Sequence, residues 1–139
     1  MERIPSENED TAFGVLKQLR LTLQLLASDA QDQGAHFPPP YFFVFSEEMI
    51  DDFDNWANCT PTYWKLSHEQ TTKLTALNEF LDSMSWQQDP HVGPDEALFT
   101  DPQWDEIRTL AKAALNAFGW PVEVPPPARW VKNALVDGV

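Results

Sequence analysis

Few residues in this chain have types and spacings suited to chemistry. The three histidines, His36, His68 and His91, stand far apart, and none has a second His or Cys at the spacing of a metal-binding motif. Cys59 is the only cysteine, so an intramolecular disulfide is impossible. The chain also lacks the GxSxG nucleophile motif and the glycine-rich phosphate-binding loops. We therefore predict no catalytic residue, no metal site and no cofactor.

Two of these residues leave an alternative open. Cys59 could act as a nucleophile only if the fold brought a base to its thiol. His91 lies in a segment with Pro and Gly, where no structural role accounts for an imidazole. A small enzyme or ligand-binding protein with a pocket near Cys59 or His91 is thus a secondary hypothesis, and the sequence favours a non-enzymatic protein.

The densest group of charged side chains lies between residues 46 and 56, where no Lys or Arg occurs. Its carboxylates are those of Glu47, Glu48, Asp51, Asp52 and Asp54. Clustered like charge raises the local potential and speeds association with an oppositely charged partner. Trp56 adjoins the cluster and is of the aromatic type that often anchors an interface. We predict that these six residues bind a basic protein partner, although such a run can also be only a solvated helix face.

The overall charge points to the same class of partner. The 139 residues include 22 Asp and Glu against 9 Lys and Arg, for a formal net charge of −13. Direct binding to nucleic acid is disfavoured, because phosphates are bound by a basic surface that displaces counterions. By class analogy alone, small acidic proteins without catalytic motifs include immunity proteins that neutralise toxins and inhibitors that mimic nucleic acid. An inhibitor or immunity-type protein is therefore our leading functional hypothesis.

The elements around the acidic cluster follow from its neighbours. Three prolines precede the unbroken apolar run 41–45, which is typical of a short buried strand. Ser46 is a candidate N-cap, and acids in the next turn suit the positive end of a helix dipole. Met49 and Phe53 share a helical face with Trp56. We expect a helix over 47–57, followed by a connection at 59–64 that Pro61 keeps from being helical.

Further helices are predicted from apolar stripes and capping signals. Asp10 or Thr11 could cap a helix that runs to about Gln31, and Ser67 forms a capping box with Gln70. The expected ranges are about 10–31, 67–86, 102–118 with Gly119 as its stop, and 129–135. The segment 87–100 is expected to be a loop, which could contain one helical turn at 95–99.

The predicted fold class is mainly α. We expect a flexible N-terminus at 1–9 and a single helical domain at 10–139, built as a compact bundle of four to five helices. Residues 41–45 could pair with 122–124 as a minimal two-stranded β element.

The first predicted helix also suggests another function. Its apolar residues extend beyond one stripe, so the surplus could serve a homodimer or a larger assembly. The chain has no apolar run of membrane-spanning length and no signal-like N-terminus, from which we expect a cytoplasmic protein without membrane contact.

Overall fold

The structure is a computed structural model that describes residues 1–5, 7–37, 45–84, 98–131 and 134–136. Its long helices are α1 (Glu9–Ala27), α3 (Phe45–Tyr63), α4 (His68–Ser83) and α6 (Pro102–Phe118), and α2 (Ala30–Ala35) is short. Two antiparallel strand pairs accompany them. Strand β1 (Glu2–Arg3) pairs with β2 (Trp64–Lys65), and β3 (Arg129–Val131) pairs with β4 (Ala134–Val136). The prediction of a mainly α bundle is confirmed.

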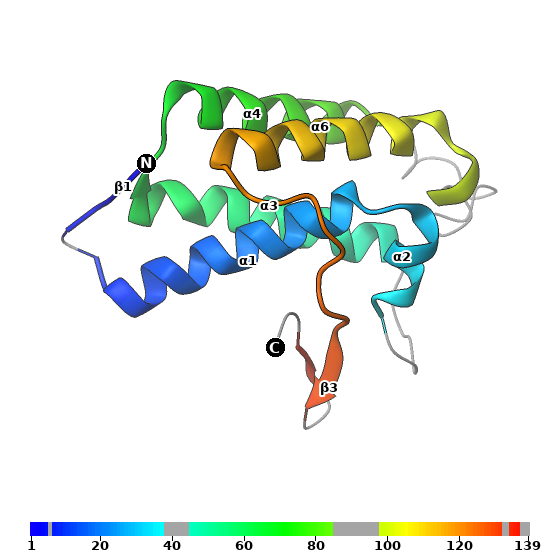
Figure 1. The fold of residues 1–139 in the computed structure, drawn as a ribbon, viewed down its shortest axis with the longest axis horizontal. Helices are drawn as coiled ribbons and strands as arrows, with labels where there is room; N and C mark the ends of the chain where they lie inside the picture. The colour runs from blue at the N-terminus through cyan, green and yellow to red at the C-terminus, as the bar shows by residue number, and fades with distance from the viewer. Residues whose placement is uncertain (6, 38–44, 85–97, 132–133, 137–139) are drawn as a thin grey trace.

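The four long helices are arranged in a ring (Figure 1). α1 packs against both α3 and α6, and α4 packs against α6. Successive long helices run in opposite directions along the bundle (Figure 1). α3 and α4 close the ring but share few contacts, so the seam between them is the loosest of the four.

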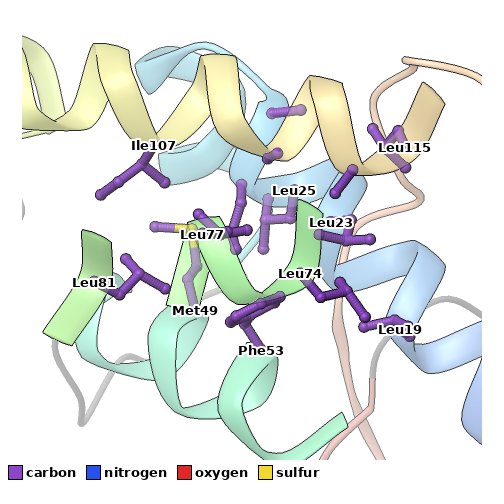
Figure 2. Packing of buried hydrophobic residues seen from close by; sticks show 14 of the residues in the cluster. Leu19, Leu23, Leu25, Met49, Phe53, Leu74, Leu77, Leu81, Ile107 and Leu115 are labelled. Carbon is purple, nitrogen blue, oxygen red and sulfur yellow. The ribbon is translucent and has the colours of Figure 1, made fainter. Parts of the chain in front are cut away.

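The core is formed by the apolar stripes that the sequence predicts. Leu19 and Leu23 of α1 face Met49 and Phe53 of α3, Leu77 of α4 lies between the helices, and all five are fully buried (Figure 2). α6 adds its predicted face, which consists of Trp104, Ile107, Ala111, Ala114 and Phe118. Burying a large aliphatic side chain contributes roughly 1.5 to 3 kcal/mol, so these stripes supply most of the stabilisation.

Several predicted helix ends are confirmed. The Ser67 hydroxyl accepts from the Gln70 N–H at 3.1 Å, and the Gln70 side chain accepts from the Ser67 N–H at 2.9 Å, which completes a capping box. Asp101 caps α6 through the Gln103 N–H. Gly119 ends α6 with φ of 72°, a conformation that glycine adopts without the Cβ penalty.

The first predicted helix is divided in two, so its expected continuation to Gln31 is wrong. α1 is capped by Asn8 and ends at Ala27, where Ser28 is extended and its hydroxyl donates to the Gln24 carbonyl at 2.8 Å. Asp29 then accepts from the Asp32 N–H and starts α2. A serine and an aspartate compete here with the helical backbone for hydrogen bonds.

α3 is longer at both ends than predicted. It begins at Phe45, before the proposed Ser46 cap, and runs through Pro61 to Tyr63. The connection predicted at 59–64 is therefore wrong. Pro61 lies in the last turn, so the lost N–H removes only one bond, and the Thr60 hydroxyl adds a bond to the Trp56 carbonyl at 2.7 Å.

The C-terminal helix predicted at 129–135 is also wrong. Arg129 pairs with Val136 and Val131 with Ala134 in the antiparallel hairpin β3–β4. Trp130 and Val131 are of the aromatic and β-branched types that favour strands, and pairing with residues 134–136 satisfies the backbone there. Residues 122–124 belong to no strand, and residues 41–44, their proposed partners, lie outside the described residues.

Two further boundaries concern the end of α4 and the N-terminal segment. α4 ends at Ser83, short of the predicted Trp86, because Met84 is extended. Trp86 and residues 87–97 of the expected loop lie outside the described residues, and residues 98–100 are helical. At the other end of the chain, β1 lies beside β2 and the Ile4 N–H donates to the Tyr63 carbonyl at 2.9 Å. The flexibility of residues 1–9 and the single-domain organisation stay predictions.

Candidate functional site

The predicted acidic cluster lies along α3. Glu47, Asp51 and Asp54 are exposed, whereas Glu48 and Asp52 are half-buried. Glu47 and Glu48 occupy the first turn, where the helix dipole favours negative charge. α3 continues for four more turns, and its carboxylates lie on two flanks of the helix, one facing α4 and the other facing α1.

One flank of α3 borders a groove on the loose seam with α4. Its carboxylates are Asp51 and Asp54 of α3 and Asp82 of α4, and Asn78 adds an amide. Apolar side chains form the rest of its lining: Ile50, Phe53, Leu81 and Met84. The volume of this acidic groove is about 220 Å³, enough for one or two side chains of a partner.

The acidic groove continues along the seam into a more apolar hollow. Asn78 lines both spaces, and the second, of about 160 Å³, is bordered by Ala57, Pro61, Leu66 and Leu74. The two together form a surface that is charged at one end and apolar at the other. Such a surface suits a ligand that carries a cation next to an apolar group.

The carboxylates of the acidic groove have no compensating cation. Within the part of the chain that the structure describes, Asp51, Asp54 and Asp82 take part in no ion pair, and no Lys or Arg lines the groove. The Asp54 carboxylate accepts one hydrogen bond, from the Asn58 amide at 3.2 Å. The local field at the groove is therefore negative and unscreened by the protein itself.

The other flank of α3 separates two predicted site residues from the groove. Asp52 and Trp56 border a different hollow, with Thr22 of α1 and His36 among its lining residues. That hollow measures only about 10 Å³, which is close to the smallest space that holds one water molecule. Trp56 is half-buried against the core. The structure thus brings Asp51 and Asp54 together in a groove, and places Asp52 and Trp56 elsewhere.

Sequence reasoning missed the contribution of α4 to the groove. Asn78 and Asp82 are one helical turn apart, so they share a flank of α4, and they border the buried Leu77 and Leu81. That spacing was readable in the sequence. Their proximity to Asp51 was not, because it depends on which helices are neighbours.

Of the four residues considered for catalysis, the structure describes Cys59, His36 and His68. Cys59 is half-buried as a free thiol on α3 and His68 is exposed. His36 is buried, with its ring edge-on to Phe37 at 5.0 Å between centroids. His91 lies outside the described residues. No group of three or more His, Cys, Asp or Glu within the described ranges is placed to hold a metal ion.

Arg108 on α6 is a second residue that sequence reasoning missed. Its guanidinium donates to the Ser28 carbonyl at 2.9 Å, to Gln33 Oε1 at 2.7 Å and to the Leu98 carbonyl at 2.7 Å. It also pairs with Asp105 at 3.2 Å, and its side chain is only 12% exposed. Burial lowers the pKa of Arg108, and Asp105 opposes that shift. These bonds tie α1, α2 and α6 together, so the role of Arg108 is structural.

Comparison with known proteins identifies no relative: no family model, no curated protein and no solved structure matches this chain. Among the described helices, none combines the length and the apolar character needed to cross a bilayer.

Proposed function

We propose that this protein is a non-enzymatic binding module whose acidic groove receives a basic segment of a partner protein. The proposal rests on one observation: three carboxylates from two helices surround a groove that no Lys or Arg lines among the residues that the structure describes. A fold gains nothing from such an arrangement, because like charges repel and Ile50 stays half-buried beside them. A Lys or Arg side chain next to an aliphatic or aromatic one would satisfy both features.

The two components of the groove have different roles in binding. The carboxylates accelerate encounter with a basic surface and penalise acidic competitors, and this effect weakens as salt screens the charges. The apolar side chains that remain accessible, Ile50 in the groove and Pro61 and Leu66 in the adjoining hollow, contribute affinity through buried area, which is insensitive to screening. Salt should therefore reduce the association rate more than it increases the dissociation rate.

The consequence for the partner follows from its charge. Proteins with basic surfaces commonly use them to bind phosphates or other anions, and an acidic protein seated there excludes those ligands. We therefore propose inhibition or neutralisation of a basic partner, in the cytoplasm, as the biological role. A fall in the activity of the isolated partner on addition of the chain, reversed by high salt, is the expected result.

The test compares two variants of equal charge. Asp51→Asn, Asp54→Asn and Asp82→Asn together alter the groove, whereas Glu79→Gln, Glu106→Gln and Glu123→Gln alter exposed carboxylates elsewhere. Each triple variant moves the formal charge from −13 to −10, because three carboxylates are removed. Partners captured from a lysate by the wild-type chain should be retained by the control variant and lost by the groove variant. Equal capture by both variants would contradict the proposal.

A further inference from the structure

A second surface, on the opposite side of the bundle, carries the chemistry that the acidic groove is expected to bind. Phe13, Leu16, Lys17 and Arg20 of α1 and Trp120, just after α6, border a hollow of about 140 Å³. We name these five residues the basic patch. Because α1 packs on both α3 and α6 while α4 packs on α6, the α1–α6 seam lies across the bundle from the α3–α4 seam (Figure 1).

The cations of the basic patch are not used within the fold. Over the described part of the chain, neither Lys17 nor Arg20 takes part in an ion pair, and Arg20 Nε is buried without a hydrogen-bond partner. Acidic residues outnumber basic ones by 22 to 9, so two neighbouring cations without a carboxylate are unexpected. Their charge is available to a ligand from outside.

Apolar groups accompany these cations. Phe13 is 51% exposed although its ring packs edge-on against Trp64 at 5.1 Å. Trp120 is half-buried and stacks on Phe118, with ring centroids 4.3 Å apart. The basic patch thus presents an aromatic side chain beside two positive charges, and the acidic groove presents apolar side chains beside three negative ones.

We propose that the acidic groove also binds a second copy of this chain, whose Lys17 and Arg20 approach Asp51, Asp54 and Asp82 while Phe13 covers Ile50. This inference rests on the proposed function of the groove. The two surfaces differ and lie on opposite sides of the molecule, so the contact is heterologous. Each bound copy leaves one groove and one patch free, and association continues into an open chain unless the rotation between copies closes a ring.

The net charge determines the conditions under which this assembly forms. Two copies of charge −13 repel each other at long range, and about 0.15 M salt shortens that repulsion to a Debye length of about 8 Å. Charge pairs in direct contact are screened less than distant ones. The average mass should therefore be highest at intermediate salt and should fall at both low salt and about 1 M salt.

Sedimentation equilibrium over a concentration series tests the inference with three chains. The wild type should increase in average mass without reaching a plateau at the dimer. The groove variant (Asp51→Asn, Asp54→Asn, Asp82→Asn) and a patch variant (Lys17→Gln, Arg20→Gln) should each associate about tenfold more weakly, because exposed charge pairs contribute a few tenths to one kcal/mol each. An equimolar mixture of the two variants should form a dimer and nothing larger, since only one intact groove can meet one intact patch.

Matched controls and a binding assay make each outcome decisive. Two control variants should assemble like the wild type: the Glu79, Glu106 and Glu123 triple variant, and Lys65→Gln with Lys112→Gln. If the Arg20 substitution perturbs folding, Lys17→Gln alone replaces the patch variant. A wild type that stays monomeric, or variants that assemble unchanged, would overturn the inference. If self-association fails but a Lys- and Leu-rich peptide still binds the monomer through the groove, the proposed function stands. If the peptide also fails to bind, the proposed function is refuted.

Discussion

The α1–α6 seam and the α3–α4 seam differ in how closely they are packed and in how completely their polar and charged side chains are paired within the chain. Across the α1–α6 seam, apolar side chains interlock and Arg108 bonds four oxygen acceptors on α1, α2, α6 and the segment before α6. Across the α3–α4 seam, contacts are few, three carboxylates lack cations and apolar side chains border open grooves. The interior of the first seam is closely packed, with the basic patch at its surface, whereas the second seam leaves a groove that we propose a ligand fills.

This difference separates stability from function in the molecule. Natural proteins tolerate incompletely satisfied surfaces where binding requires them, at a cost in folding free energy. Substitutions in the packed interior of the α1–α6 seam should therefore affect unfolding, and substitutions in the groove of the α3–α4 seam should affect binding. The following predictions test that division, from the largest expected effect to the smallest.

Shortening a core side chain should have the largest effect on the free energy of unfolding. Leu23 of α1 is fully buried, so Leu23→Ala should lower the free energy of unfolding by about 3 kcal/mol through lost burial and a residual cavity. Leu66, half-buried beside the apolar end of the α3–α4 seam, provides the matched substitution, with an expected loss of about 1 kcal/mol. Urea unfolding measures both. Equal losses would show that the two seams are packed alike.

Removing the guanidinium group of Arg108 should have the next largest effect on the free energy of unfolding. Arg108→Met leaves the Ser28 and Leu98 carbonyls and the Gln33 amide oxygen without their donor, which should cost about 2 to 3 kcal/mol. Arg108→Lys keeps the charge but not the forked donors, so it should recover only part of the loss. Thermal unfolding of the three chains ranks them. A stability loss below about 0.5 kcal/mol for Arg108→Met would contradict the structural role of this residue.

The capping box at the start of α4 should contribute less. Ser67→Ala removes the acceptor for the Gln70 N–H, and the expected loss is about 1 kcal/mol. Because α3 and α4 share few contacts, this loss should add to that of Met49→Ala in the core face of α3, with little coupling between the two. A double-mutant cycle in urea checks the additivity. Strong coupling would indicate that α3 and α4 act as one packed unit.

Neutralising the acidic groove should have the smallest effect on folding, and of opposite sign. The Asp51, Asp54 and Asp82 triple variant relieves repulsion among three carboxylates, which should raise the free energy of unfolding by about 0.5 kcal/mol. The Glu79, Glu106 and Glu123 triple variant should change the free energy of unfolding by less than about 0.3 kcal/mol. Unfolding in low salt is the measurement. A clear destabilisation of the groove variant would mean that its carboxylates serve the fold.

The sequence predicted what depends on local signals. The stripes of α1, α4 and α6 were readable because helical periodicity places Leu19, Leu77 or Ile107 on one face, and the caps at Ser67 and Asp101 follow from short-range hydrogen bonds. It failed where local signals compete. Pro61 did not stop α3, and the C-terminal residues form a hairpin because pairing across strands outweighs their weak helical tendency.

The site was only half predictable for a related reason. Asp51 and Asp54 stand out in the sequence as members of an acidic run, but only the order of the helices in the ring places Asp82 opposite them. The same tertiary arrangement turns Asp52 and Trp56 away, to the seam with α1. Apart from Asp105, three residues before it, the acceptors of Arg108 lie 10 to 80 residues away, so most of its bonds have no local signal in the sequence.

The central claim is that the acidic groove binds a cation carried next to an apolar group. Amide chemical-shift mapping tests it most directly, with a Lys- and Leu-rich peptide added to the isotope-labelled chain under conditions in which the chain is monomeric. The predicted result is a set of shifts concentrated on Asp51, Asp54, Asn78 and Asp82, reduced by high salt and absent in the groove variant. Shifts centred instead on Asp52 and Trp56, or unchanged spectra at saturating peptide, would contradict the account.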